Sequence, residues 1–361
     1  MGSDVWFSIN NLEMLQRQSN IELLRIIAML LIIAHHLVVH SGLLAQFGPI
    51  YSNPAELKSQ CALILGAFGK TGINVFVLIS GYFYAKKEFH FEKYAKLFLE
   101  VLFYRVLIHI IFLCAGFEHF TTLDYIKIVI PFSTIGTLFI DSYLAFLLFI
   151  PFLSKLVSVM NQKQHRNLVL LLLALFSLLG NIKAPGIRIS IMNYLSWFIV
   201  LFFVGTYIRL YPHKFFSNVK FLFCSTISLL LLSCASIIFC WQNKWIDPYY
   251  FVSDSNMPLA FLLGVSLLLL FNTIRLPYNK FINTLAIGTF AVLLIHDHSA
   301  IMQRWLWHDI LKITSYYKEP YAFLYYILVT IFIFVLCSTF DQIRIRFIER
   351  PLFTFQQKNV K

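Results

Sequence analysis

Apolar runs near or above the roughly 20 residues that span a bilayer recur along the whole chain. Of the 361 residues, 59% are hydrophobic and only 13% are charged. A soluble domain carries about a quarter charged residues, and it needs them to keep apolar patches off its surface. The sequence therefore predicts an all-α polytopic integral membrane protein, and it leaves no room for a separate soluble domain.

The apolar runs divide the chain into about ten predicted transmembrane helices. They cover residues 21–40, 62–85, 97–116, 137–153, 167–181, 194–211, 219–241, 257–273, 281–301 and 320–340. We expect residues 1–361 to form one membrane domain, with a short N-terminal segment at 1–20 and a basic tail at 341–361. No internal repeat is visible, which is mild evidence against a transporter built from duplicated halves.

The basic residues lie mostly in short loops between the apolar runs, the pattern that sets membrane topology rather than one that binds nucleic acid. With the N-terminus inside, nineteen of the 29 lysines and arginines fall in cytoplasmic segments and eight in outer segments. The remaining two, Lys70 and Arg105, lie within spans. This split predicts that both termini are cytoplasmic. The six cysteines show no C-x-x-C spacing, so neither a disulfide framework nor a zinc site is expected.

Four ionisable side chains, Glu22, Arg25, His35 and His36, lie within the first predicted span, where such groups are costly to bury and tend to mark function. At 100° per residue, Arg25 and His36 fall within about 20° of one another, with His36 about 16 Å further toward the outer half. Glu22 can pair with Arg25 across one turn, whereas His35 points elsewhere. The structural alternative is an interfacial arginine and a hydrogen-bonded histidine.

Further ionisable and polar groups occur in the second and ninth predicted spans. Lys70 and Asn74 share a face of the second span, and a lysine at this depth needs an anion or a cavity. His296 lies at about the depth of His36, which suggests one pocket, although a satisfied core histidine is the alternative. We expect His296 and Asp297 to face different ways. No metal site is expected, because the ligands lack a spacing such as H-E-x-x-H.

These segments resemble the bacterial membrane-bound acyltransferase-3 family over nearly the whole chain. The segment 20–36 looks like the family's first helix, in which Arg25 and His36 match an Arg–ten residues–His signature. The segments 72–83, 281–297 and 348–352 are similar to later family motifs, in the right order. The likeness is strongest to the branch that O-acetylates capsular and exopolysaccharides.

The resemblance implies an enzyme that moves an acetyl or other short acyl group from acetyl-CoA on the cytoplasmic side to a hydroxyl of a surface polysaccharide or its lipid-linked precursor. It implies that His36 is the general base or acyl relay, with His35 as the alternative residue for this role. An unperturbed imidazole titrates near pH 6.5, which suits removal of a hydroxyl proton at neutral pH. Arg25, held in place by Glu22, would bind the donor phosphates through two parallel hydrogen bonds from its guanidinium.

The resemblance also assigns the donor passage and the acceptor pocket. Ser80 and Gly81 would line the passage for the pantetheine arm. For the glycines of this span, close helix packing is the alternative. Many relatives carry an Arg-x-x-Arg motif in the loop after the second helix, but this chain has Lys93-x-x-Lys96. Lysine has no guanidinium and cannot form the paired hydrogen bonds that arginine makes with a phosphate. Ordinary positive-inside charge is the alternative for this loop. The acceptor pocket would contain Lys70, Asn74, His296 and Asp297.

The expected partners are acyl-CoA, a surface glycan or lipid-linked oligosaccharide, the bilayer of the bacterial inner membrane and polysaccharide-assembly proteins, but no nucleic acid and no metal. Two other functions fit a basic polytopic protein. A polysaccharide flippase or polymerase would bind no CoA. A proton-coupled transporter that used His36, His296 and Lys70 as a relay would show pH-dependent flux without consuming a thioester.

Overall fold

The structure is a computed structural model that describes residues 17–117, 128, 130, 132–181, 183–184, 187–188, 191–245 and 247–351. Almost all regular secondary structure of the described chain is helical, which confirms the predicted all-α fold class. The exception is a short antiparallel hairpin of β1 (Lys183–Ala184) and β2 (Ile187–Arg188). Most of the predicted N-terminal segment and part of the predicted basic tail, at 1–16 and 352–361, fall outside the described residues.

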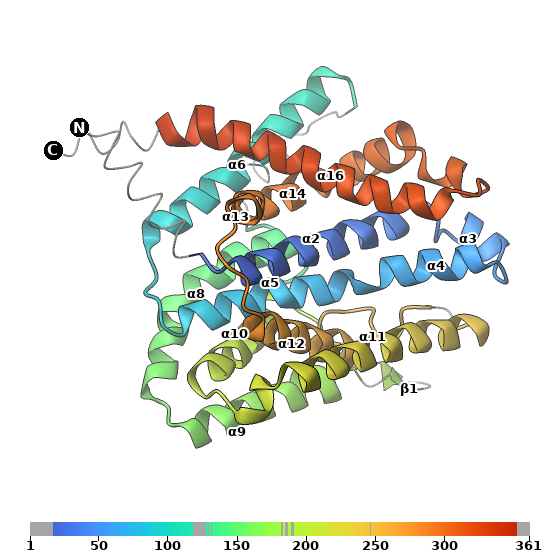
Figure 1. Ribbon diagram of the computed structural model, residues 1–361. Helices are drawn as coiled ribbons and strands as arrows, with labels where there is room; N and C mark the ends of the chain where they lie inside the picture. The colour runs from blue at the N-terminus through green and yellow to red at the C-terminus, as the bar shows by residue number, and fades with distance from the viewer. Residues whose placement is uncertain are drawn as a thin grey trace.

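The helices follow the order of the apolar runs and pack side by side as a bundle (Figure 1). The first half of the chain contains α2 (Ser19–His40), α3 (Pro49–Ser52), α4 (Leu57–Leu65), η1 (Gly66–Phe68), α5 (Gly69–Tyr84), α6 (Phe91–Cys114) and α8 (Phe139–Val159). The second half contains α9 (Gln162–Leu173), η2 (Ala174–Leu178), η3 (Leu179–Asn181), α10 (Tyr194–Leu210), η4 (Lys214–Ser217), α11 (Val219–Gln242), α12 (Pro258–Thr273), α13 (Lys280–Ile287), α14 (Thr289–His296), α15 (Ala300–Arg304), η5 (Trp305–Ile310), η6 (Ile313–Tyr316), α16 (Ala322–Arg344) and η7 (Ile345–Glu349).

Length and composition qualify six helices of the described chain as membrane-spanning, or seven if one bent pair counts as a single span. Two shorter apolar helices, α10 and α12, lie beside them. The protein is therefore a multi-pass membrane protein. Helical structure occupies each of the ten predicted spans, but the number that cross the bilayer stays a prediction.

Asparagine side chains start several of these helices. Asn161, Asn193, Asn218 and Asn279 each precede a helix, and each accepts a hydrogen bond from the backbone N–H three residues later. The first N–H groups of a helix have no partner within the helix, so a side-chain oxygen at this position stabilises the helix end. The polar residues between the apolar runs thus set where α9, α10, α11 and α13 begin.

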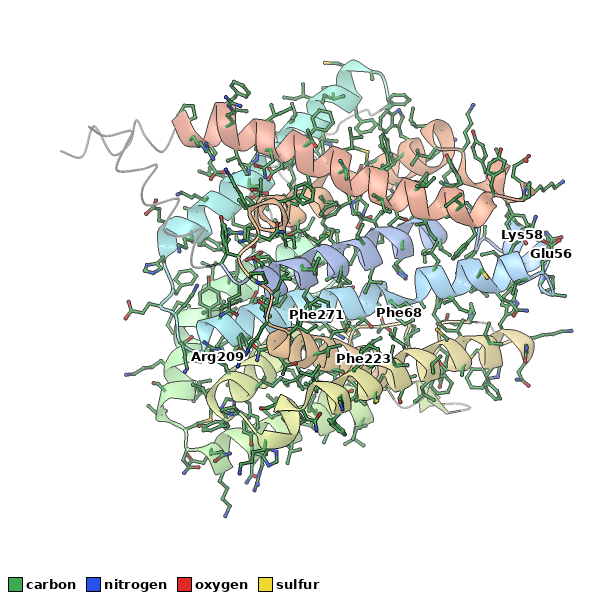
Figure 2. The ribbon with its side chains drawn as sticks, viewed as in Figure 1. Glu56, Lys58, Phe68, Arg209, Phe223 and Phe271 are labelled. Carbon is green, nitrogen blue, oxygen red and sulfur yellow. The ribbon has the colours of Figure 1, made fainter. Side chains whose placement is uncertain are left out.

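Helix α2 begins, and α16 ends, at the same end of the bundle (Figure 1). We call it the Arg25 end, and Arg209 near the end of α10 also lies there (Figure 2). The opposite end, which we call the His36 end, carries Glu56 and Lys58. The described chain thus starts and finishes at one end, as an even number of crossings requires. Which end faces the cytoplasm stays a prediction.

Two predicted spans are not straight helices. The second contains the 3₁₀ turn η1 between α4 and α5. The prediction of the ninth span, 281–301, is wrong at its C-terminal end, because α14 ends at His296 and the next helical segment is bent away by 94°. Asp297 leaves the helical conformation at φ −116° and ψ 27°. Ser299 then caps the next helix by accepting a hydrogen bond from the Met302 N–H.

Helix α5 runs between α2 and α10 and lies very close to α10. A Cβ atom built at Gly205 would lie 2.6 Å from the carbonyl oxygen of Leu78, and one built at Gly81 would lie 2.8 Å from the carbonyl oxygen of Phe202. Only residues without a side chain permit such an approach. Backbone contact through small residues is a common way for membrane helices to associate, because lipid supplies no hydrophobic driving force between them.

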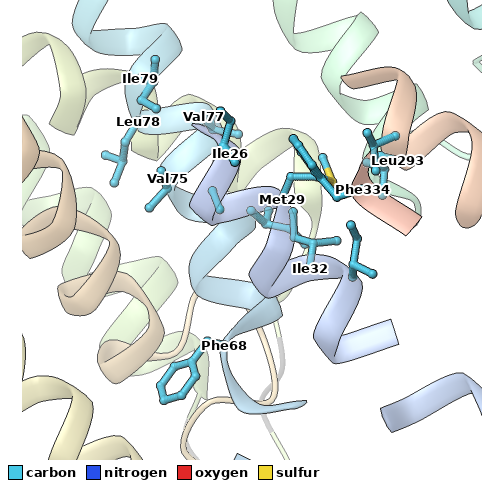
Figure 3. Close-up of a cluster of buried hydrophobic side chains, with 14 of the residues drawn as sticks. Ile26, Met29, Ile32, Phe68, Val75, Val77, Leu78, Ile79, Leu293 and Phe334 are labelled. Carbon is cyan, nitrogen blue, oxygen red and sulfur yellow. The ribbon is translucent and has the colours of Figure 1, made fainter. Parts of the chain in front are cut away.

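The side of α2 between Arg25 and His36 is packed with apolar side chains. Met29 and Ile32 have exposed fractions of 1% and 2%. Figure 3 shows Met29 beside Phe334 of α16 and Leu293 of α14. This packing holds α2 rigidly along its length, so the polar groups at its two ends are fixed relative to one another.

Replacing Gly205 by leucine should destabilise the fold, because the new side chain would overlap the α5 backbone. We expect a loss of roughly 1–3 kcal/mol, the usual cost of overpacking a core, seen as a lower unfolding temperature in nanodiscs. Leu231→Ala, on a side chain that is 65% exposed on α11, serves as the control and should leave that temperature nearly unchanged. Equal unfolding temperatures for Gly205→Leu and the wild type would contradict the close contact.

Candidate functional site

Two histidines from distant helices meet at the His36 end. The Nδ1 atom of His36 on α2 lies 3.0 Å from the Nε2 atom of His296 on α14, which is hydrogen-bond distance. The side chain of His36 is 13% exposed, whereas His296 is only 1% exposed. The predicted meeting of His36 and His296 is confirmed, whereas the acceptor pocket around them stays a prediction.

Asp297 joins this pair because α14 ends one residue before it. Its Oδ1 atom lies 3.6 Å from Nδ1 of His36 and 4.0 Å from Nε2 of His40. The expectation that His296 and Asp297 face different ways is therefore wrong, since it assumed a continuous helix. Gln303 donates a hydrogen bond of 2.6 Å to the same carboxylate oxygen and orients it.

His35 faces away from this pocket, as predicted. Its Nδ1 atom lies 2.6 Å from the carbonyl oxygen of Gly66, at the start of the 3₁₀ turn η1. A carbonyl oxygen can only accept, so this ring nitrogen donates. The bond supports a backbone group at the break between α4 and α5. His35 thus connects α2 to the second predicted span at the point where that span is interrupted. Because its Nδ1 is used in this hydrogen bond, that nitrogen is not available for the predicted catalytic role.

Lys70 and Asn74 lie one turn apart on α5 but have different surroundings. The Lys70 ammonium donates a hydrogen bond of 3.1 Å to the Tyr194 hydroxyl, and its charge also acts on His36 and Asp297. Lys70 is therefore near enough to His36 and Asp297 for its charge to act on both.

Asn74, in contrast, is fully buried among helices. Its amide donates to the carbonyl oxygen of Ser255 at 2.7 Å and accepts from Nε1 of Trp197 at 2.8 Å. Both ends of the side chain are thus used to join α5 to α10 and to the segment before α12. The structure places this predicted acceptor residue at a helix junction.

Glu22 lies between two guanidinium groups at the Arg25 end. Its Oε2 atom is 3.7 Å from Arg25 and 3.7 Å from Arg17, and the residue is only 5% exposed. The predicted pairing of Glu22 with Arg25 is confirmed. The side chain of Arg25 is 29% exposed, and its charge acts on Tyr84 and Tyr143. The guanidinium is therefore near enough to α5 and α8 for its charge to act on a tyrosine of each.

Ser80 and Gly81 point to different neighbours. The Ser80 hydroxyl donates to the carbonyl oxygen of Phe76 at 3.2 Å and lies 2.9 Å from the Tyr143 hydroxyl. Gly81 instead faces the α10 backbone at Phe202. The predicted role of Gly81 in lining the donor passage does not fit this position, because the close helix contact leaves no space there.

Tyr143 is a site residue that the sequence analysis did not identify. Its ring stacks on Phe139 at 5.6 Å with an interplanar angle of 9°, and it contacts Phe290 at 5.7 Å. A signal was present, because Asp141, Ser142 and Tyr143 form a polar triplet inside a predicted span. Tyr143 thus joins α8 to α5 and α14, on the side of α8 that faces Ser80.

Asp141 of this triplet also pairs with Arg105, which the charge count had placed within a span. Arg105 donates to Oδ1 of Asp141, and the other carboxylate oxygen accepts from the backbone N–H of Thr134 at 3.0 Å and from its hydroxyl at 2.7 Å. A charge inside the bilayer is costly unless it is paired. This pair joins α6 to α8.

A cavity of about 350 Å³ opens at the Arg25 end, where α5, α8 and α10 finish. Tyr84 contributes to its wall, and the charge of Arg25 acts on the same tyrosine. Hydroxyl-bearing side chains and apolar side chains share its wall. The full lining is Tyr84, Ala85, Ser154, Val157, Ser158, Met160, Thr206, Leu210 and Tyr211.

Lys93 and Lys96, which were predicted to lie in a loop, are part of helix α6 and do not line this cavity. Lys96 pairs with Glu92 at 3.3 Å and lines a separate groove of about 460 Å³ together with Arg344 and Glu349. Lys93 is exposed at the start of α6. The structure therefore places Lys96 in the groove between α6 and the end of α16.

His36, His40 and Asp297 could also hold a metal ion, since one ligand atom from each lies within 4.8 Å of the others. The Nδ1 atom of His36 is already bonded to His296, however. A metal bound through that atom would replace this hydrogen bond. The expectation that no metal binds stays a prediction.

The comparisons with known proteins give one match. A protein-family model described as an acyltransferase domain, of the acyltransferase-3 type, matches residues 18–341. No curated protein and no solved structure matches the chain. The matched region contains both ends of α2 and the His36–His296 pair.

Replacing Asn74 by alanine should lower stability, because the Trp197 N–H and the Ser255 carbonyl would lose their partner in a buried place. The expected cost is about 1–3 kcal/mol, measured as a lower unfolding temperature in nanodiscs. Asn243→Ala, at an exposed position at the end of α11, is the matched control. Unchanged stability for Asn74→Ala would contradict the structural role of this side chain, and its predicted role in the acceptor pocket would stand.

Proposed function

This chain belongs to the acyltransferase-3 family, and we propose that it moves an acetyl or other short acyl group from acyl-CoA to a hydroxyl of a surface polysaccharide or its lipid-linked precursor. One observation supports this most: His36, with His296 and Asp297 beside it, and Arg25, with Glu22 beside it, occupy opposite ends of the same rigid helix.

In this proposal His36 is the general base. Its imidazole takes the proton of the acceptor hydroxyl while the oxygen attacks the thioester carbonyl, so that a C–O bond forms and the C–S bond breaks. The proton then passes from the imidazolium to the leaving sulfur of CoA. The Asp297 carboxylate, 3.6 Å from Nδ1 of His36, favours the imidazolium while it exists.

The donor enters at the Arg25 end. The Arg25 guanidinium, oriented by Glu22, binds phosphate oxygens through its planar fork. The neighbouring cavity of about 350 Å³ accepts the nucleotide part against Tyr84 and Tyr211. Arg25 and His36 are separated by roughly 16 Å along the helix axis, a length comparable to the pantetheine arm. The arm passes beside Ser80 and Tyr143, which the donor must move aside.

The acceptor binds at the His36 end. Lys70 and Asp297 offer a hydrogen-bond donor and an acceptor to sugar hydroxyls, and Tyr194 offers an aromatic face beside Lys70. With the Arg25 end cytoplasmic, as the charge distribution predicts, the acyl group leaves the cytoplasm and reaches a glycan on the outer side. The setting is the inner membrane of a bacterium, beside polysaccharide-assembly proteins.

The test is thiol release from acetyl-CoA by the purified protein in nanodiscs, with lipid-linked glycan as acceptor. His36→Ala should lower kcat by about 10²- to 10⁴-fold, the usual contribution of a general base. Arg25→Ala should mainly raise KM for acetyl-CoA, because a phosphate contact is lost. His213→Ala, at an exposed histidine outside the site, is the control and should keep both constants.

A wild-type protein that neither binds CoA nor releases thiol with a validated acceptor would overturn the acyltransferase proposal. The row of His36, His296 and Asp297 could then serve proton transfer instead. In that case, proteoliposomes should show a proton flux that His36→Ala abolishes.

A further inference from the structure

A continuous row of hydrogen bonds leads from a backbone carbonyl to the proposed base. The carbonyl oxygen of Val292 lies 2.6 Å from Nδ1 of His296, and Nε2 of the same ring lies 3.0 Å from Nδ1 of His36. Val292 is one turn before His296 on α14, so the helix itself supplies the first member of the row.

The positions of the protons follow from what each atom can do. A carbonyl oxygen only accepts, so Nδ1 of His296 carries a hydrogen. A neutral imidazole has one N–H, which leaves Nε2 of His296 as an acceptor. Nδ1 of His36 must then be the donor across 3.0 Å. Neutral His36 consequently has its free lone pair on Nε2.

We propose that His296 is a positioning residue that holds His36 in the tautomer whose Nε2 is the base. The proposal rests on the proposed function, in which His36 removes the proton of the acceptor hydroxyl. It changes the predicted role of His296, which the sequence analysis placed in the acceptor pocket. His296 is 1% exposed and both of its ring nitrogens are used, so it cannot bind an acceptor.

Distance decides between His296 and Asp297 as the partner that orients His36. The Asp297 carboxylate lies 3.6 Å from Nδ1 of His36, beyond hydrogen-bond distance. The same carboxylate oxygen accepts a bond of 2.6 Å from Gln303. Nε2 of His296, at 3.0 Å, is within reach. Asp297 therefore acts on His36 through its charge, whereas His296 fixes which nitrogen carries the hydrogen.

The row stays intact during the reaction. When Nε2 of His36 takes the hydroxyl proton, the imidazolium carries hydrogens on both nitrogens, and its Nδ1–H still donates to His296. The proton on Nε2 then passes to the sulfur of the leaving thiolate. His296 remains neutral throughout and gains or loses no proton. The ring of Trp307 packs edge-on against His296, with centroids 6.4 Å apart, and keeps its orientation fixed.

The proposal is tested by two substitutions that differ only in hydrogen bonding. His296→Gln keeps an amide oxygen that can accept from His36 and an amide N–H₂ that can donate to the Val292 carbonyl. His296→Leu fills similar space with neither. The measurements are kcat and KM for acetyl-CoA with a glycan acceptor, and the ¹⁵N chemical shifts of labelled histidine rings. His36→Ala assigns the signals.

We expect His296→Leu to lower kcat by about 10²- to 10⁴-fold, as the wrong tautomer does in other enzymes, with little change in KM for acetyl-CoA. His296→Gln should recover most of that loss. In the wild type, Nδ1 of His36 should carry the hydrogen, and in His296→Leu part of the signal should move to Nε2. Thr226→Val removes a buried hydrogen bond between α11 and α12, away from both proposed binding regions, and controls for the loss of stability alone.

Wild-type kcat in folded His296→Leu, or a hydrogen on Nε2 of His36 in the wild type, would overturn the proposal. Equal losses in His296→Leu and His296→Gln with an unchanged tautomer would also overturn it. The tautomer measurement needs no substrate. It therefore tests which nitrogen of His36 carries the hydrogen even if the wild type transfers no acyl group. Absence of acyl transfer would overturn the proposed function and not the tautomer assignment.

Discussion

The close contact of α5 with α10 is the constraint on which the rest of the bundle depends. Gly81 and Gly205 let the two backbones approach to a distance that no larger residue would allow. Asn74 then joins the same helices by hydrogen bonds to Trp197 and Ser255. With α5 fixed, Lys70 at its start and Ser80 near its end take defined positions along the membrane axis, and α2 packs against a rigid neighbour.

Along α2, apolar packing separates two polar centres. Met29 and Ile32 are almost fully buried between Arg25 and His36. Because this part of the helix is packed and rigid, the guanidinium and the imidazole cannot approach one another. The arrangement suits a reaction in which a long donor binds at one end and reacts at the other. Each polar centre is stabilised by its own buried partner, Glu22 at one end and His296 at the other.

Breaks in the helices build the site as much as the helices do. The 3₁₀ turn η1 uses His35 as a hydrogen-bond partner at Gly66, which leaves His36 as the histidine of the pair that faces the pocket. The end of α14 at His296 turns the Asp297 carboxylate toward the same pocket. A regular helix would have pointed it roughly 100° away. Irregular backbone inside a membrane protein is tolerated where protein groups satisfy it, and both breaks have such groups.

The sequence by itself determined the all-α membrane fold and the pairing of Glu22 with Arg25, because these follow from apolar run lengths and helical periodicity. The matching depths of His36 and His296 in their spans also predicted that the two side chains meet. Only the tertiary structure decided that Asp297 faces His36, that Asn74 lies in a helix contact, and that Tyr143 meets Ser80. Each of these depends on where a helix ends or which neighbour it packs against. Periodicity within one segment carries no information on either, since partners from distant segments make the contacts.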